Sequence, residues 1–408
     1  MKTTYKKIIA IVAAIVVIFG LGFFFTHQQS ASAADNNGRT TITFWHSMNG
    51  PNEKVLEGLV DQFNKSQTKY TVKPIYAGSY ELSIMKYANT VGSNVSPDLI
   101  QSDQANQSMM IGLNSTVPVQ KFIDRDHYDL SQLYPGVTAA YKINGKLASM
   151  PFNSSTPILY YNKDMFDKAG VTEVPTSLEG IAEVADDLVN KGGAGEALSM
   201  GIYGWFFEEF MCKQGLPYVD NGNGREAAAT KVAFDENGGA LNILNEWKKL
   251  YDAGYAPNVG RGGDSGLADF SSGKAAMTLG STASLKQILQ DVNGSFEVGT
   301  AYFPSITDDD KGGVSIGGAS LWMLDNQDDA KKAATWEFVK YLVSAESQAY
   351  WNAQTGYFPV TTAAHDEQVF KDNIENTHSS RQPLTSFMIL HRNMQVHFSV
   401  YSRKHVRL

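Results

Sequence analysis

The chain has 408 residues, of which 43% are hydrophobic and 19% are charged, and its formal net charge is −8 at pH 7. That length exceeds what one hydrophobic core usually supports, so we expect two lobes. The acidic balance argues against nucleic acid as a partner. A single cysteine, Cys212, excludes an internal disulfide.

The N-terminus has the pattern of an export signal. The basic residues Lys2 and Lys6 precede an apolar run at 8–25, and an Ala-Ser-Ala cleavage pattern follows at 31–33. The run is also about as long as the ~18 residues that a membrane span requires. We therefore expect an exported protein in which residues 1–33 are either a cleaved signal peptide or a retained membrane anchor.

The first folded elements predict an α/β lobe with a mainly parallel sheet. Residues 40–45 alternate as a strand does, apolar residues recur at helical spacing over 55–63, and residues 70–76 read as a second strand. In such sheets, ligands lie outside the carboxyl ends of the strands, which places Trp45 and His46 near a cleft. We interpret His46 as a structural histidine.

A second α/β unit is predicted after residue 150. A short apolar strand at 158–161 is followed by a capping-box pattern at 176–179, which predicts the start of a helix. Apolar periodicity predicts further amphipathic helices at 242–251 and 328–343.

No arrangement of residues in the sequence indicates catalysis, a cofactor or a metal site. The stretch Gly-Asp-Ser-Gly at 263–266 resembles a protease nucleophile loop, but its flanks do not continue that motif and no histidine context supports a triad. The sequence contains no HExxH zinc motif and no P-loop. The three aspartates at 308–310 lack EF-hand spacing and read as an exposed turn.

The segment MPFNSSTPILYYNKDMFDKAG at 150–170 sets small hydroxyl side chains before an aromatic strand, a pattern suited to a polar ligand. Five other strings follow the same order as in one known family: FWHSMNG (44–50), GSYE (78–81), GLP (215–217), SIGGASLW (315–322) and TGYFPVTTAAHD (355–366). Over residues 40–370 the chain resembles the glycerol-3-phosphate-binding proteins of bacterial ABC importers, a branch of the sugar-binding solute receptors.

The resemblance implies an α/β fold of the two-lobe periplasmic-binding-protein type II, with a hinged interlobe cleft. It implies chain crossings near 148–153, 274–284 and 318–327. The expected division is lobe 1 at 39–150 and 284–320, lobe 2 at 151–283 and 321–370, and an aberrant, poorly packed tail at 371–408.

The resemblance also implies a set of ligand-binding residues, by motif match. These are Tyr80, Gln104, Ser155, Trp205, Ser281, Gly318 and Tyr357. Thr282 is the alternative to Ser281. Trp205 matches the residue on which the ligand stacks.

Two departures from the family pattern bear on ligand choice. Gln104 stands where the family has a glutamate, and its hydrogen bonds lack the charge assistance of a carboxylate. The family also places a phosphate-binding arginine in a C-terminal Gly-x-Met-Pro-x-x-Arg stretch, which does not occur in this sequence. Arg261 is an alternative cation for the phosphate. The sequence stops matching the family pattern near Lys371, which we interpret as a shifted reading frame or a divergent natural tail.

The resemblance implies an exported, monomeric receptor that captures glycerol-3-phosphate or a glycerophosphodiester and delivers it to ABC permease subunits, without catalysis or cofactor. The alternative within the class is an oligosaccharide receptor. The alternatives from other classes are a secreted hydrolase, which predicts turnover, and a surface adhesin, which predicts no small-molecule binding.

Overall fold

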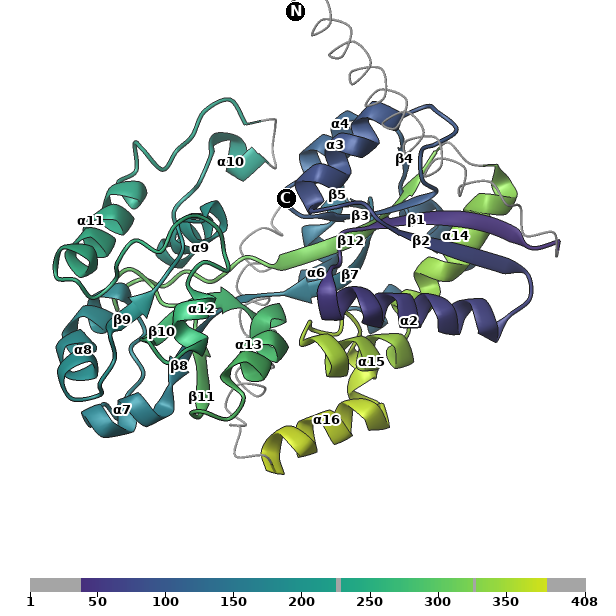
Figure 1. The fold of residues 1–408 in the computed structure, drawn as a ribbon. Coiled ribbons are helices and arrows are strands. Elements are labelled where there is room, and N and C mark those ends of the chain that lie inside the picture. Colours follow the sequence, from purple (N-terminus) through teal and green to yellow (C-terminus); the bar gives the residue numbers. More distant parts are fainter. Residues whose placement is uncertain (1–37, 225–228, 326–327, 380–408) are drawn as a thin grey trace, which may run out of the picture.

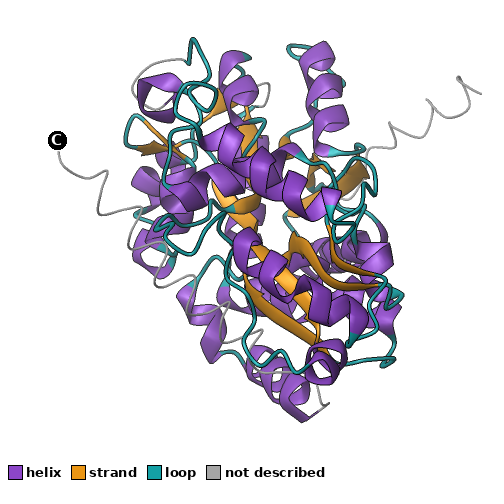
Figure 2. Ribbon diagram, turned by 90° about the vertical axis from the view of Figure 1, so that its left-hand side faces the viewer, coloured by secondary structure: helices purple, strands orange, loops and turns teal. Residues whose placement is uncertain are grey.

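The computed structural model describes residues 38–224, 229–325 and 328–379, and in this part of the chain the strands form two main sheets (Figure 1). Each sheet is flanked by helices, so the molecule has two α/β lobes, which confirms the predicted fold class. Figure 2 shows helices on the outside of the strands in both lobes.

The larger sheet has the strand order β2-β1-β3-β12-β4, and β7 pairs with β12. Its strands are β1 (Thr40–His46), β2 (Tyr70–Tyr76), β3 (Leu99–Asp103), β4 (Thr116–Val117), β7 (Met150–Ser155) and β12 (Gly317–Leu324). β1 runs parallel to β2 and β3, whereas β12 is antiparallel to β3, β4 and β7. The parallel part follows from the predicted strand–helix–strand order.

Helices cover both faces of this sheet. They are α2 (Gly50–Ser66), α3 (Tyr80–Thr90), α4 (Gln107–Gly112), α5 (Gln120–Asp126), α6 (Pro135–Ala140), α14 (Asp329–Leu342), α15 (Ala345–Thr355) and α16 (Gln368–Ser379). In Figure 1, α2 and α15 lie below the sheet while α3 and α4 lie above it. α2 buries Leu56, Leu59, Val60 and Phe63, the face that the helical spacing predicts. A hairpin of β5 (Lys142–Ile143) and β6 (Lys146–Leu147) precedes β7.

The smaller sheet has the order β11-β8-β10-β9. Its strands are β8 (Pro157–Asn162), β9 (Glu196–Ser199), β10 (Ala275–Ser281) and β11 (Val298–Tyr302). Its helices are α7 (Lys163–Ala169), α8 (Leu178–Asn190), α9 (Gly204–Gln214), α10 (Asp220–Gly224), α11 (Gly239–Asp252), α12 (Leu267–Ser271) and α13 (Leu285–Val292). The cap of α8 is Ser177, whose hydroxyl accepts from Gly180 N at 2.9 Å, so the helix begins one residue later than the capping-box pattern predicts.

Each lobe has an aromatic-rich core. In the larger lobe, Phe44 and Phe338 meet edge to face with ring centroids 5.6 Å apart, and Trp336 is fully buried beside Phe122. In the smaller lobe, Phe210 packs on Phe303 at 4.8 Å. Buried aromatic pairs of this kind add about 0.5–1.5 kcal/mol each beyond their burial, which keeps each lobe rigid.

The chain passes between the lobes at places that differ from the expected ones. It leaves the larger sheet after β7 and enters the smaller sheet at β8, and it returns through residues 303–316 into β12. The sheet pairing therefore assigns two segments to the lobe opposite to the expected one. β11 pairs with β8 and puts much of 284–320 with the smaller lobe, and β12 pairs with β3 and puts 321–370 with the larger one. α13 packs against both α12 and α15, so it lies between the lobes.

The expected tail boundary at Lys371 falls inside α16, which continues to Ser379. Phe370 is buried, and Lys286 Nζ donates to Asn373 Oδ1 at 3.2 Å, so the start of this helix is attached to the body. The rest of the expected tail, 380–408, and the expected signal peptide or anchor, 1–33, lie outside the described residues. Among the helices of the described ranges, none has the length and apolar character that crossing a membrane requires.

Candidate ligand-binding site between the lobes

A chain of buried amides connects the carboxyl ends of β1, β3 and β7. Asn153 Oδ1 accepts from Gln101 Nε2 at 2.8 Å, and Gln101 Oε1 accepts from Ser47 N at 3.0 Å. The other side of the Asn153 amide, Nδ2, donates to the Tyr80 hydroxyl at 3.1 Å. Gln101 and Asn153 are both fully buried, so their pairing satisfies groups that would be costly to leave unmade and fixes the Tyr80 ring.

Tyr80 and Tyr357 are brought together at this end of the larger lobe. Tyr80 is the first residue of α3, and Tyr357 follows α15 and stacks on Trp351 with ring centroids 5.6 Å apart. Burial is the largest cause that raises the pKa of both phenols; Tyr357 also raises the pKa of Tyr80 electrostatically, whereas a hydrogen bond with Tyr80 acts to lower the pKa of Tyr357. Both therefore stay neutral at physiological pH and can donate as well as accept hydrogen bonds.

Asp103, the last residue of β3, adds a carboxylate to the same region. Its Oδ1 accepts from Asn106 N at 3.3 Å and from Asn106 Nδ2 at 2.6 Å. The pKa of Asp103 is raised to about 6, chiefly by burial; the nearby Glu81 acts in the same direction, and the hydrogen bonds from Asn106 act against it. Burial also raises the pKa of Tyr203, with Glu81 and Asp103 as the next causes. Since Tyr203 belongs to the smaller lobe, the two lobes face each other here.

Trp205, Ser155 and Gly317 meet where the chain passes between the lobes. Ser155 ends β7 and pairs with Gly317, the first residue of β12. A Cβ added to Gly317 would lie 2.9 Å from both Ser155 Oγ and Trp205 Cζ2. The indole of Trp205, in the first turn of α9, is half-buried against this glycine, and its neighbours are the rings of Tyr203 and Phe206.

Gly318 allows the two crossing strands to approach very closely. Its φ of +103° is rarely adopted by residues with a side chain, and an added Cβ would lie 1.9 Å from Asn153 O. Its carbonyl accepts from Gln104 N at 3.4 Å. A glycine is therefore required at this position by both conformation and space.

The remaining predicted residues lie around this group. Ser281 is partly exposed, and its hydroxyl accepts from Ala283 N at 3.2 Å, whereas Thr282 is fully buried and its Oγ1 accepts from Thr156 N at 3.2 Å. Of the two alternatives, Ser281 is the one open to a ligand. Gln104 has a buried Oε1 with no hydrogen-bond partner among the described residues.

Sequence reasoning missed four residues of this region: Gln101, Asp103, Asn153 and Tyr203. Polar side chains in predicted buried strands, as in LIQSD and MPFNSS, are a usable signal for the first three, because such groups require partners. Nothing in the sequence predicts that Asp103 acts electrostatically on Tyr203, since that interaction depends on how the lobes meet.

The other residues considered for chemistry have structural roles. His46 is 1% exposed, and burial lowers its pKa to about 4, which agrees with its interpretation as structural. Ser265 Oγ donates to Arg261 O at 2.6 Å inside a loop, with no histidine bound to it among the described contacts. In the described ranges, no three His, Cys, Asp or Glu side chains are grouped closely enough to hold a metal ion.

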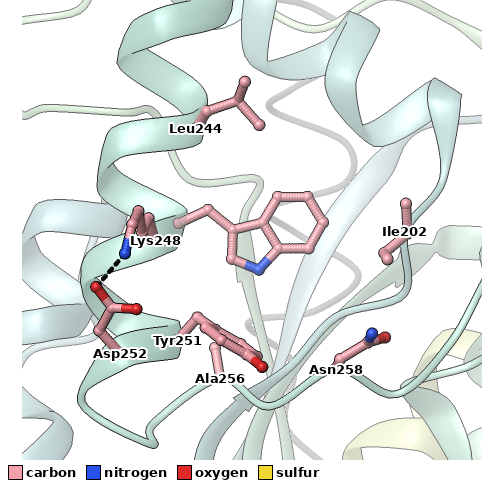
Figure 3. Close-up of a pocket in the computed structure, with 8 residues that line it drawn as sticks. Ile202, Leu244, Lys248, Tyr251, Asp252, Ala256 and Asn258 are labelled. Atoms are coloured by element: carbon pink, nitrogen blue, oxygen red, sulfur yellow. Dashed lines mark hydrogen bonds and ion pairs between the residues drawn. The ribbon is translucent and has the colours of Figure 1, made fainter.

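A separate groove of about 370 Å³ lies on the smaller lobe (Figure 3). It is lined by Ile202, Leu244, Trp247, Lys248, Tyr251, Asp252, Ala256 and Asn258, most of which come from α11. None of the predicted ligand-binding residues lines this groove. Ile202 immediately precedes Tyr203, so one short segment contributes to both the groove and the site between the lobes.

The chain matches the family model described as bacterial extracellular solute-binding protein over residues 58–378. The sn-glycerol-3-phosphate-binding periplasmic protein UgpB of Yersinia pestis is 33% identical over 338 residues, which is 80% of this chain and 75% of that protein. The protein of the same name from Salmonella typhimurium is 33% identical over 336 residues, or 80% of this chain and 76% of that one.

Solved structures show the same fold. UgpB from Mycobacterium tuberculosis, in complex with glycerophosphocholine, is similar with a TM-score of 0.72 and 21% identity, over 91% of this chain and 94% of that one. The GacH receptor of Streptomyces glaucescens, solved unliganded and with acarbose, is similar with a TM-score of 0.69 and 22% identity, over 90% and 94%.

Proposed function

We infer the function of this chain from one premise: it belongs to the bacterial extracellular solute-binding proteins. It is a receptor of an ABC importer, which captures a small solute outside the cytoplasm and presents it to the permease. The two-lobe fold suits this task, because a ligand that contacts both lobes stabilises their closed arrangement.

We propose that the ligand is glycerol-3-phosphate or a glycerophosphodiester. The single observation that carries this proposal is the joint geometry of Trp205, Ser155 and Gly317, which places a flat ring, a hydroxyl and a bare backbone together between the lobes. A ring and hydrogen-bonding groups of this kind suit a short polyol. The relatives from Yersinia pestis and Salmonella typhimurium are sn-glycerol-3-phosphate-binding proteins, which supports the same ligand class.

We propose the following roles for the site residues. Trp205 packs on the glycerol carbons, and the hydroxyls of Tyr80, Ser155, Ser281 and Tyr357 bind oxygens of the ligand. The backbone at Gly318 approaches the ligand closely, and Gln104 binds a glycerol hydroxyl. Asp103 supplies the carboxylate that Gln104 lacks, since it lies beside Tyr203 of the opposite lobe.

Arg261 is the proposed cation for the phosphate. The backbone of Arg261 forms a parallel β-bridge with Ile202, two residues before α9, the helix that carries Trp205. Asp264 in the same loop acts electrostatically on Tyr357 of the larger lobe, so this loop faces the site. A guanidinium there could form paired hydrogen bonds with phosphate oxygens.

A second candidate ligand is an oligosaccharide. The aromatic group formed by Tyr203, Trp205 and Phe206 favours it, because sugars pack on such rings. The GacH receptor, solved with acarbose, has the same fold. We place this candidate second because the relatives with higher identity carry the glycerol-3-phosphate name.

We propose that the protein binds its ligand without turnover, acts as a monomer, and remains at the cell surface or in the periplasm. If the N-terminal segment is not cleaved, we propose that it anchors the protein to the membrane. The relatives are solute-binding proteins rather than enzymes, which supports binding without chemistry. Incubation with glycerophosphocholine should release no free choline, and steady release would establish the hydrolase alternative instead.

A thermal-unfolding screen of the full chain tests the ligand class. Glycerol-3-phosphate or glycerophosphocholine at a hundred times its Kd should raise the free energy of unfolding by about 2.7 kcal/mol. Maltotriose at the same concentration should leave it unchanged. Stabilisation by maltotriose alone would select the oligosaccharide receptor, and stabilisation by none of the three would reject both ligands.

A further inference from the structure

Helix α9 carries a fully buried carboxyl group that the proposed binding roles do not use. Glu209 is 0% exposed, whereas its neighbour Glu208 is exposed. Taking a carboxylate out of water is costly unless its oxygens find strong donors. A buried acid in a helix that also carries the proposed stacking tryptophan therefore calls for a physical explanation.

Both oxygens of Glu209 are bound by one residue of the segment that returns to the larger lobe. Ser315 N donates to Glu209 Oε2 at 2.8 Å, and the Ser315 hydroxyl is in contact with Glu209 Oε1. Ser315 lies two residues before β12, the strand that enters the larger sheet. Glu209 thus joins the helix of one lobe to a strand of the other.

The returning segment is attached to α9 at two further points. Gly312 N donates to Lys213 O at 2.8 Å, and a Cβ on Gly312 would lie 1.9 Å from Cys212 O. Near the other end of the helix, Gly317 lies against the Trp205 indole. The middle attachment is made by the Glu209 side chain, so the Glu209–Ser315 contact helps to fix how the segment lies along the helix.

Trp205 and Glu209 are one helical turn apart, at positions i and i+4, and so lie on the same face of α9. A change in the Glu209–Ser315 contact would therefore shift Gly317 relative to the indole. Ser155, which pairs with Gly317, would move with it.

We propose that Glu209 is a positioning residue, which holds the returning segment on α9 and thereby sets the distance between Trp205, Gly317 and Ser155 that the ligand requires. This inference rests on the proposed function, because it assigns Glu209 a role in the same site. Glu209 itself does not touch the ligand.

The protonation state of Glu209 gives this role a measurable signature. Burial raises its pKa from the ordinary value of 4.5 to about 8, while the hydrogen bonds from Ser315 act in the opposite direction. The charged groups that interact electrostatically with Glu209 are Glu208 and Lys213 of α9. Asp310 of the returning segment also interacts electrostatically with Lys213. At neutral pH the group is mostly a neutral acid, and it ionises as pH rises through about 8.

Closure around a ligand excludes water from the cleft beside Trp205, one helical turn from Glu209, which lowers the dielectric constant around the buried acid and favours its neutral form. Because binding and proton uptake are linked, affinity should fall above the pKa. The contribution of Glu209 to the free energy of unfolding also falls as pH rises. The folded state binds the proton more tightly than the unfolded state, so this contribution is fully present below 4.5 and is lost as pH rises to about 8.

Titration of the full chain with glycerophosphocholine at pH 6.5 and pH 9.5 tests the proposal, because this phosphodiester does not change charge in that range. The wild-type Kd should rise by up to about tenfold, which is the limit for a one-unit rise in the pKa of Glu209 on closure. In Glu209→Gln, whose amide cannot ionise, the rise should be less than about threefold. The matched control Glu208→Gln should keep the wild-type ratio. Equal ratios in wild type and Glu209→Gln would overturn the proposal.

A ligand-free measurement separates this proposal from the proposed function. Tryptophan emission of the wild type should change with a midpoint near pH 8, and the change should be absent from Glu209→Gln and from Trp205→Phe. Absence of the transition from the wild type would overturn the positioning role, whatever the ligand. A transition without any glycerophosphocholine binding would sustain the link between Glu209 and Trp205 and reject the ligand class.

Discussion

Substitution of Trp205 by alanine should weaken glycerophosphocholine binding by about tenfold to a hundredfold, or roughly 1.4–2.8 kcal/mol. The indole lies between Gly317 and the rings of Tyr203 and Phe206, so its removal deletes the flat surface proposed to pack on the ligand. It also leaves a space that water can fill, which weakens the neighbouring hydrogen bonds. Calorimetric titration of the two proteins measures the difference.

Trp247 provides a matched control for this experiment. It is a half-buried tryptophan of the same lobe, on α11, and it lines the separate groove rather than the site between the lobes. Trp247→Ala should lower stability and leave the Kd within about threefold of the wild-type value. Unchanged affinity in Trp205→Ala, or an equal loss in both variants, would show that Trp205 only supports the fold.

Substitution of Gly318 by alanine should abolish measurable binding and lower the free energy of unfolding by about 2–4 kcal/mol. The added Cβ would lie 1.9 Å from Asn153 O, and the two residues belong to β12 and β7, the paired strands next to which the chain passes between the lobes. Relief of this clash requires β12 to move away from β7. That movement disturbs Asn153, which holds the Tyr80 hydroxyl.

Gly170→Ala separates the clash from backbone strain. Gly170 has a φ of +74° at the end of α7, and nothing lies within 4 Å of an added Cβ. Its substitution should cost about 1 kcal/mol of stability and leave binding intact. Denaturant unfolding and titration of both variants give the comparison. Normal binding by Gly318→Ala would contradict the account of the crossing strands.

Much of the larger lobe could be predicted from local patterns. The strand at 70–76 and the buried face of α2 match the alternation and helical spacing of the sequence, because those signals depend on neighbours in the chain. The division between lobes could not be predicted in this way. β11 pairs with β8 and β12 pairs with β3 through long-range backbone hydrogen bonds, which leave little trace in local composition.

The candidate site, too, could be predicted only in part. Motif strings predicted Tyr80, Ser155, Trp205, Gly318 and Tyr357 as ligand-binding residues. The structure places Tyr80 near Tyr357, and Trp205 and Ser155 around Gly317, the neighbour of Gly318. Residues whose role depends on their hydrogen-bond partners could not be predicted from the sequence. Asn153 is informative only with Tyr80 and Gln101 beside it, and Glu209 only with Ser315. Glu209 directly follows the exposed Glu208, so its sequence neighbour gives no indication that it is buried.

Small-angle X-ray scattering of the purified protein, with and without saturating glycerophosphocholine, tests the central claim that a glycerol phosphate ester is held between the two lobes. We expect the radius of gyration to fall when the ester is added, because a ligand that contacts both lobes draws them together. Maltotriose should leave it unchanged. An unchanged radius of gyration with the ester, or compaction with maltotriose alone, would contradict the account.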